Sequence, residues 1–292
     1  MITNIDAPVR DLAWVFAALT LTPQAAKPVV ASPAPLPTPP PSLPWPALPL
    51  SMVELDWDHW SVIARIAGLR VGVNDDIRAE HRSRGPRKNL LNDIQGCAGE
   101  IVSLLSLAAN PQAGGVRYLA LSFDDPGNDD PDIITTLDGR AFRAETKCLL
   151  MKPDKHFFLV NRKAHQKSID RKADYYLPVL TGLGCRRAMV GRPIPINDIK
   201  DWRVKDFDFG DPALAMPLDK FCPAYFDMSV AEVRATLNGH APEEDPEEID
   251  AQANEAVGRL DDLRLTERGP WRDMPIGDLM RKVTALFPST QE

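Results

Sequence analysis

The chain has 292 residues, of which 44% are hydrophobic and 26% charged, and its formal net charge at pH 7 is −7. No apolar run approaches the roughly eighteen residues that cross a bilayer, and residues 12–21 make a poor secretory signal, which excludes a membrane protein. The four cysteines are scattered without C-x-x-C spacing, which argues against a zinc site and predicts reduced thiols in the cytoplasm.

Composition divides the chain into four parts. Residues 1–22 predict a short helix, and residues 23–50, with eleven prolines and almost no charge, predict a semi-rigid linker. Residues 51–228 are long enough to form one α/β domain. Residues 229–292 predict a helical and acidic C-terminal extension.

The first half of the domain alternates helical and extended patterns. Residues 54–69 are typical of a helix, whereas the polar and basic residues 75–88 predict a loop. Residues 89–109 repeat apolar side chains every three or four positions, which predicts a second helix. A strand over residues 116–123 and an acidic, turn-rich run are expected next.

A hairpin follows. Residues 133–137 are β-branched and apolar, and residues 141–150 are typical of a returning strand. Asp138-Gly139 between them is a pair that favours a tight hairpin turn.

The second half of the domain predicts further short elements. Residues 157–160 are extended, Asn161 can cap a helix that runs to about residue 171, and residues 175–180 predict a strand. Residues 187–196 predict an edge strand. The aromatic side chains that follow are expected to form a packed cap on the domain: Trp202, Phe207, Phe209, Phe221, Tyr225 and Phe226.

The C-terminal extension opens with a capping box. Ser229 and Glu232 have the spacing in which each side chain bonds the other residue's backbone N–H at the start of a helix. Residues 241–248 predict a disordered acidic linker. Two helices are expected after it, at about 248–264 and 275–287.

Three charged side chains are predicted to meet on one face of the hairpin. Glu145 and Lys147 are two residues apart on a strand and so share a face, and the hairpin brings Asp132 back beside Glu145. The other face carries Phe142, Ala144 and Thr146. Burial of the trio without partners would cost several kcal/mol, so we expect solvent or a divalent cation to satisfy the charges.

This trio suits phosphodiester hydrolysis. Two carboxylates at one point are hard oxygen ligands for Mg²⁺, which polarises a phosphoryl group and lowers the pKa of a bound water. The lysine can orient that water or offset the charge that grows on the phosphate.

The spacing Pro131-Asp132, twelve residues, Glu145-Thr146-Lys147 resembles the signature of the PD-(D/E)XK phosphodiesterase superfamily. The order of predicted elements between residues 88 and 195 is similar as well. The resemblance implies an α/β, restriction-endonuclease-like fold with an αβββαβ core and a mixed central sheet, flanked by helical N- and C-terminal extensions. It also implies a nuclease that depends on Mg²⁺ or Mn²⁺, with DNA as the expected substrate.

The resemblance suggests further site residues. An acid on the first core helix of this superfamily often reaches the metal, and Glu100 matches that position; the alternative is a solvated glutamate on the helix surface. Asn161, His165 and Ser168 share a face of the third helix, where Asn161 and His165 would contact phosphate or water. A helix cap and a surface histidine are the alternative interpretation.

Other residues compete for these roles. Gln166 and Lys167 are rivals of His165, and Arg162 and Lys163 add cations to the same helix as candidate phosphate contacts. The first carboxylate could also come from Asp129, Asp130 or Asp138. Pro131 and the start of the strand favour Asp132.

The distribution of charge supports a nucleic-acid partner more than the net charge does. Residues 140–205 hold sixteen Lys/Arg and six Asp/Glu, and residues 65–88 hold seven and three. Residues 206–292 hold eight and nineteen, so the acidic excess is in the C-terminal part. We give the local balance more weight, because salt screens distant charges and phosphate contacts supply affinity.

Two other functions remain open from the sequence. One is a non-catalytic subunit that binds nucleic acid or organises an assembly, with the proline-rich N-terminus or the acidic C-terminus contacting a protein partner. The other is an RNase. Cleavage of both strands of a duplex would call for a homodimer, since one site cuts one strand, although the sequence has no dimer signature. Restriction, phage defence and DNA repair are the settings that the resemblance suggests.

Overall fold

The computed structural model describes residues 48, 50–78, 86–118, 130–206, 212–238, 245–267, 271 and 274–288. These residues belong to one compact unit that spans 46–292. Several predictions lie outside the described residues: the helix in residues 1–22, nearly all of the proline-rich linker, strand residues 119–123, both Phe207 and Phe209, and linker residues 241–244. No helix in the described ranges is long and apolar enough to cross a membrane.

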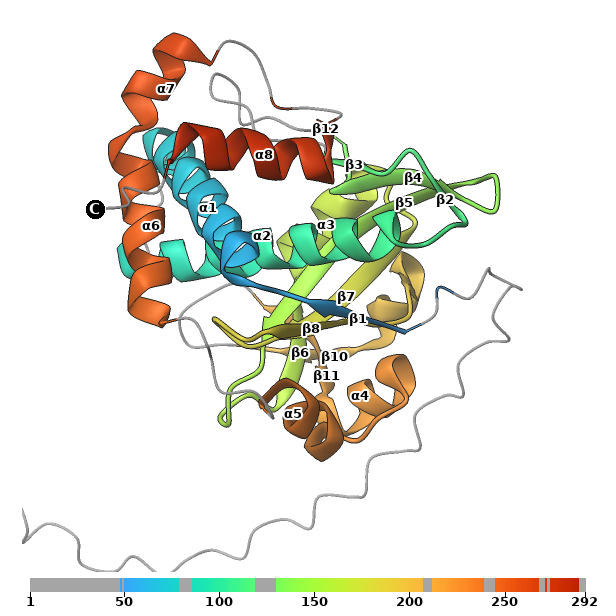
Figure 1. The fold of residues 1–292 in the computed structure, drawn as a ribbon. Coiled ribbons are helices and arrows are strands. Elements are labelled where there is room, and N and C mark those ends of the chain that lie inside the picture. The colour runs from blue at the N-terminus through green and yellow to red at the C-terminus, as the bar shows by residue number, and fades with distance from the viewer. Residues whose placement is uncertain are drawn as a thin grey trace, which may run out of the picture. The chain divides into compact units, whose positions relative to one another are not determined.

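A mixed β-sheet forms the centre of the α/β fold (Figure 1). Its strands follow the order β1 (Ser51–Glu54), β8 (Arg187–Val190), β7 (Tyr175–Thr181), β5 (Arg140–Leu150), β4 (Ile133–Leu137) and β2 (Ala113–Gly114), and β9 (Ile194–Pro195) also pairs with β7. Strands β5 and β7 are parallel, and the other pairs are antiparallel. The predicted strands at 133–137, 141–150 and 175–180 are therefore confirmed.

Two long helices and the C-terminal helices form a group beside this sheet (Figure 1). They are α1 (Trp57–Arg78), α2 (Pro86–Ala108), α6 (Pro246–Gly258), α7 (Leu260–Thr266) and α8 (Ile276–Leu286). All positions of α1 from Trp60 to Leu69 are buried, so this helix is covered on every side instead of having one apolar stripe. Helix α6 lies so close to it that a Cβ on Gly68 would be 2.0 Å from the carbonyl oxygen of Ala253.

A second, smaller layer lies at the other end of the molecule (Figure 1). A three-stranded sheet with the order β10 (Arg203–Lys205), β11 (Ala213–Pro217) and β6 (Phe157–Asn161) packs with α4 (Leu218–Phe226) and α5 (Val230–Asn238). Phe158 stacks on Phe221 with ring centroids 4.1 Å apart, and Trp202 meets both rings edge-on. The expected aromatic cap is confirmed for Trp202, Phe221 and Phe226, all of which are buried.

Both predicted helix caps form as the sequence indicates. Asn161 caps α3 (Arg162–Asp170) by accepting from the backbone N–H groups of Lys163 and Ala164. The backbone N–H of Ser229 donates to Glu232 at 2.7 Å, and that of Glu232 donates to the Ser229 hydroxyl at 3.2 Å.

Several predictions were wrong in part. Residue 54, predicted to begin a helix, belongs to β1, and the helix predicted at about 248–264 is the two helices α6 and α7. Residues 75–78 and 86–88 belong to α1 and α2 and not to a loop, so the polar surface of a helix was read as a loop. Strand β8 is internal, because β1 pairs along it. Strand β3 (Arg117–Tyr118) pairs with β12 (Met274–Pro275) outside the central sheet. Helix α6 begins at Pro246, where the Asp245 side chain accepts from the N–H of Glu247, so the acidic linker ends earlier than expected.

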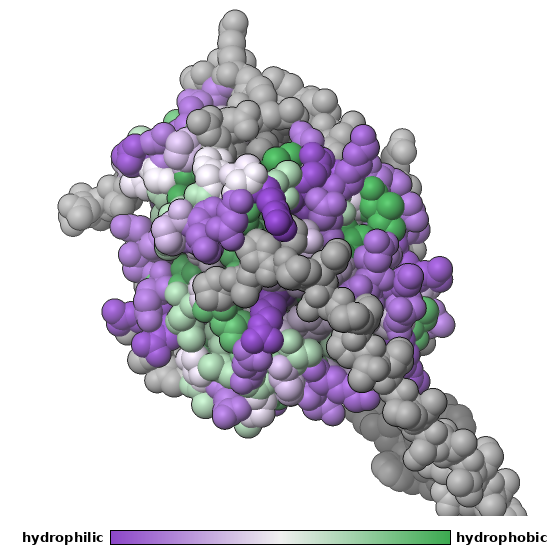
Figure 2. All heavy atoms as spheres, turned by 90° about the vertical axis from the view of Figure 1, so that its right-hand side faces the viewer, coloured by the Kyte–Doolittle hydropathy of each residue, from purple (hydrophilic) through white to green (hydrophobic). Residues whose placement is uncertain are grey.

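The outer surface is mostly hydrophilic on the face that Figure 2 shows, with apolar side chains in small groups between polar ones. Among the described residues, the large apolar side chains with the most exposure are Met52, Leu159, Ile169 and Val204. They come from β1, β6, α3 and β10, and single exposed apolar residues are normal on the surface of a folded domain.

Replacement of Gly99 by alanine is expected to destabilise the protein by about 1–3 kcal/mol, the usual cost of overpacking a core. A Cβ at this position of α2 would lie 2.7 Å from Cβ of Cys148 and 2.9 Å from Cγ2 of Thr146, so α2 would have to move away from β5. Urea unfolding measures the change. Gly96→Ala on the same helix is the matched control, because its Cβ meets nothing within 4 Å, and it should be neutral or stabilising by up to about 1 kcal/mol. Equal effects of the two substitutions would contradict the close packing of α2 on β5.

Candidate active site

The hairpin between β4 and β5 sets the geometry of the site. Asp138 and Gly139 form a two-residue turn with φ values of 48° and 72°, the left-handed conformation that such turns require. The register then pairs Ile133 with Ala144, which places Asp132 beside Glu145. The carboxylate of Asp132 accepts a hydrogen bond from the backbone N–H of Thr146 at 2.9 Å.

Glu145 is buried, with a side chain only 6% exposed, and two cations hold its carboxylate. The ammonium of Lys147 lies 3.3 Å from one oxygen, and the guanidinium of Arg171 lies 3.3 Å from the other. Burial and the charge of Asp132 raise the pKa of Glu145, against the opposing effect of the two cations. Two protein cations thus contact the carboxylate, which offsets part of the cost of burying it.

Lys147 is held in its charged form. Burial alone would lower the pKa of its ammonium, but the charges of Asp132 and Glu145 outweigh burial and raise the pKa. The ammonium also lies 5.3 Å from the ring centroid of Tyr176, which the parallel register of β5 and β7 sets opposite Glu145. The place of Lys147 on β5, the carboxylate of Glu145 and the ring of Tyr176 therefore fix the position of this ammonium group.

Glu100 extends from α2, and Arg70 of α1 engages both of its oxygens. The two guanidinium nitrogens donate to the carboxylate at 2.7 Å and 2.5 Å, in the two-point geometry that suits arginine and carboxylate. Burial raises the pKa of Glu100, Arg70 opposes this, and the charges of Asp132 and Glu145 add to the rise. The structure therefore places Glu100 near the other two acids, although its oxygens already have a cationic partner.

The α3 candidates separate into different roles. Asn161 acts as the helix cap. Nδ1 of His165 lies 3.0 Å from the hydroxyl of Tyr176, so His165 reaches the neighbourhood of Lys147 only through that ring. Burial lowers the pKa of His165, which favours the neutral imidazole. Arg162, Lys163 and Lys167 are exposed on the surface of α3.

The alternatives to Asp132 have different positions. Asp138 forms part of the turn at the far end of the hairpin from Glu145. Asp130 lines a pocket near the end of α3, and Asp129 lies outside the described residues. The register thus brings Asp132 to Glu145, as the sequence predicts.

Three site residues were not anticipated: Arg70, Arg171 and Tyr176. The two arginines are ordinary members of basic stretches, and only the tertiary fold pairs them with acids. For Tyr176 the sequence did predict the element that carries it, since residues 175–180 were expected to form a strand. Its pairing with Glu145 depends on the register of two parallel strands, which local sequence does not define.

The donor set fits a hard divalent cation. Carboxylate oxygens of Asp132 and Glu145 are the ligands that Mg²⁺ prefers, and the charge of Asp132 contributes to the raised pKa of Glu145, so a cation beside them would stabilise both ionised forms. Within the described ranges, no three acidic, histidine or cysteine side chains are already arranged as a metal-binding group. A cation bound by Glu145 would share its carboxylate oxygens with the ammonium of Lys147 and the guanidinium of Arg171.

Comparison with known proteins gives no relative from which to transfer a function. No protein-family model matches this chain, and neither the curated proteins nor the solved structures contain a significant match.

Proposed function

We propose that this protein is a metal-dependent nuclease that hydrolyses phosphodiester bonds, with DNA as its substrate. The observation that carries the proposal is the register of the β4–β5 hairpin, which brings Asp132 to Glu145 and leaves Lys147 on the same face. An acidic pair that includes the buried Glu145, joined to a half-buried charged lysine, is costly to maintain for stability alone. It supplies the groups that phosphodiester hydrolysis needs.

The arrangement of elements supports the same proposal. Strands β3 and β6 also fall in this stretch of the chain but belong to the two smaller sheets, and β2 stands where the strand over residues 116–123 was expected. Among the helices and the strands of the central sheet, α2 is followed by β2, β4 and β5, which are neighbours, and then by α3 and by β7, parallel to β5. This is the order helix, three strands, helix, strand that the resemblance to PD-(D/E)XK nucleases implies. We therefore propose a restriction-endonuclease-like core over residues 86–181, within the wider mixed α/β fold.

Each residue has a distinct part in the proposed reaction. Asp132 and Glu145 would hold Mg²⁺ or Mn²⁺, with Glu100 assisting, and the bound metal would polarise the phosphoryl group and activate a water. Lys147, whose raised pKa keeps it protonated at neutral pH, would orient the attacking water or stabilise charge on the phosphate. Arg171 would move from Glu145 toward the same negative charge.

Glu145→Gln is expected to remove metal-dependent cleavage and to lose the metal-induced rise in Tm. The substitution keeps the shape of the side chain and removes the negative charge that would bind the cation. Cleavage of supercoiled plasmid, single-stranded DNA and matched RNA is measured with Mg²⁺, Mn²⁺ or EDTA, alongside thermal unfolding with each metal. Asp138→Asn is the matched control: it also removes one carboxylate from the hairpin, but at the exposed turn, and asparagine tolerates the left-handed conformation there.

The results separate the proposed activity from its alternatives. The nuclease proposal is supported if the wild type cuts DNA only with a metal, if Glu145→Gln has lost this activity and if Asp138→Asn has kept it. Cutting of RNA alone would replace DNA with RNA as the substrate. DNA that the wild type and both variants bind but never cut, with any of the metals, would contradict the nuclease and leave a nucleic-acid-binding subunit.

A further inference from the structure

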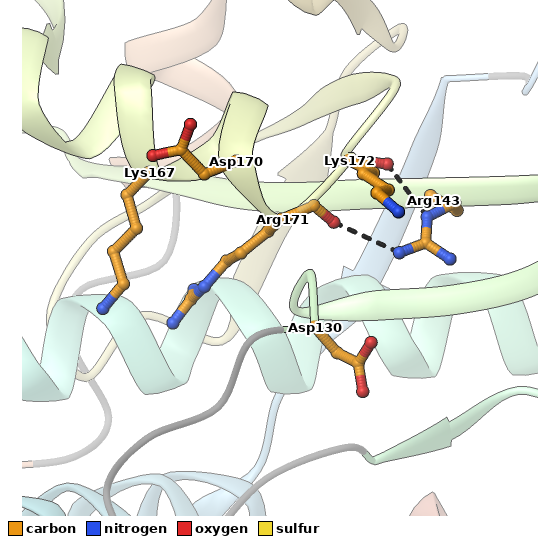
Figure 3. Close-up of a pocket in the computed structure, with 6 residues that line it drawn as sticks. All are labelled: Asp130, Arg143, Lys167, Asp170, Arg171 and Lys172. Carbon is orange, nitrogen blue, oxygen red and sulfur yellow. Dashed lines mark hydrogen bonds between the residues drawn. The ribbon is translucent and has the colours of Figure 1, made fainter.

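A pocket of about 500 Å³ lies beside the C-terminal end of α3 (Figure 3). Six residues line it, of which four are cations: Arg143, Lys167, Arg171 and Lys172, together with Asp130 and Asp170. Lys167 and Arg171 extend in the same direction from the end of α3, and Lys172 and Arg143 stand on the other side. The pocket is thus a concave site with a positive excess.

The wall of the pocket is fixed by hydrogen bonds between β5 and the end of α3. The guanidinium of Arg143 donates to the carbonyl oxygens of Lys172 at 2.9 Å and Arg171 at 3.1 Å, the two bonds drawn in Figure 3. Lys172 has a φ of 57°, which turns the chain away as the helix ends. The backbone positions of three of the four cations are therefore set before any ligand arrives.

The charges in the pocket favour an anion. In the described part of the chain no ion pair holds the ammonium groups of Lys167 and Lys172, both of which belong to exposed residues. Asp170 accepts a hydrogen bond from Gln166 at 3.0 Å. A helix C-terminus carries partial negative charge and repels anions, so the attraction must come from these side chains.

The pocket is connected to the candidate active site through Arg171. This residue lines the pocket, and its guanidinium lies 3.3 Å from the carboxylate of Glu145. Arg143 precedes Glu145 by two residues on β5, so both side chains are on the same face of the strand. An anion in the pocket would be next to the carboxylate cluster.

We propose that this pocket binds a backbone phosphate of the nucleic-acid strand, adjacent to the phosphate that is attacked at Asp132, Glu145 and Lys147. The inference rests on the proposed nuclease function and adds a second anchoring point for its substrate. A phosphate is a compact anion that several Lys and Arg side chains can share, and such contacts position a strand without reading its sequence.

The test is the salt dependence of binding to a fluorescent single-stranded oligonucleotide, measured by anisotropy in EDTA so that no cleavage occurs. Lys167→Ala/Lys172→Ala is the informative variant, because both residues are exposed and neither contacts the carboxylate cluster, whereas Arg171 does. Loss of one phosphate contact should reduce the slope of log K against log salt by about 0.7 and weaken binding about fivefold at 0.1 M salt, equally for unrelated sequences. Lys200→Ala/Lys220→Ala removes the same charge outside the pocket and should leave the slope unchanged.

Each other outcome overturns the inference in a recognisable way. Equal slopes for the pocket variant and the wild type would exclude a phosphate contact there, even if Glu145→Gln still abolishes cleavage. Equal losses for both double variants would indicate a diffuse charge effect in place of a site. A third outcome is that the oligonucleotide does not bind, while calorimetry shows that inorganic phosphate binds the wild type and not the pocket variant. The ligand of the pocket would then be a small phosphate compound and not a nucleic-acid strand. Cleavage lost in Glu145→Gln is the separate result on which the nuclease proposal itself depends.

Discussion

Replacement of Lys147 with methionine is expected to lower metal-dependent cleavage by about 10²–10⁴-fold, the range typical for loss of a positioned catalytic group. Methionine retains the unbranched stem and removes the ammonium that lies 3.3 Å from Glu145 and 5.3 Å from the ring centroid of Tyr176. The pKa of Lys147 is raised, so the group lost is a cation at neutral pH and not a general base. The effect should therefore be on kcat, with little change across the neutral pH range.

Lys147→Arg provides the control for this experiment. It retains the positive charge near Glu145, and so the fold, but places a planar, forked group where a compact ammonium was. We expect a stable and nearly inactive protein, as judged by thermal unfolding and by single-turnover cleavage. Full activity in Lys147→Met, in a preparation that Glu145→Gln inactivates, would show that the lysine has no part in the chemistry.

Arg70→Met is expected to destabilise the protein by about 3 kcal/mol at neutral pH, as is usual when one partner of a buried ion pair is removed. The side chains of Arg70 and Glu100 are 19% and 15% exposed, and the guanidinium is the cation that holds both oxygens of Glu100. Without it, Glu100 remains buried near the charges of Asp132 and Glu145, which already raise its pKa.

The size of this loss should depend on pH in a defined direction. The folded protein holds the Glu100 proton more tightly than the unfolded chain does, and the loss of Arg70 raises the folded pKa further. The loss of unfolding free energy in Arg70→Met is therefore largest above the pKa of Glu100 in the folded protein. It decreases as the pH falls through that pKa, because Glu100 becomes neutral. Urea unfolding of Arg70→Met at a series of pH values measures the trend. The double variant Arg70→Met/Glu100→Gln should recover most of the stability at neutral pH, and a double variant as unstable as the single one would contradict the assignment of the loss to an unpaired carboxylate.

Local chemistry was sufficient to predict the hairpin and its acids. Asp138-Gly139 favours one type of turn, that turn defines the register, and the register defines which side chain meets Asp132. The Asn161 cap and the Ser229–Glu232 capping box were predictable for the same reason, because every atom involved is within a few residues.

The partners of the acids could not be predicted in this way. Arg70 meets Glu100 across two helices, and Arg171 meets Glu145 from the end of α3, so each pairing depends on how helices pack and not on a local pattern. Strand β8 was placed at the edge of the sheet for a related reason. Its neighbour β1 precedes it by more than a hundred residues, and short strands carry little information about distant partners.

The burial of α1 on every side has a consequence for how this protein folds during its synthesis on the ribosome. Its buried stretch from Trp60 to Leu69 is covered in part by α6 and α8, which are synthesised much later than α1 because they begin at Pro246 and Ile276. At about 5–20 residues per second, that surface would wait on the order of ten seconds or more for its cover. Nascent chains should therefore need a chaperone until α6 appears, and growth at high expression rates should yield aggregates seeded by α1.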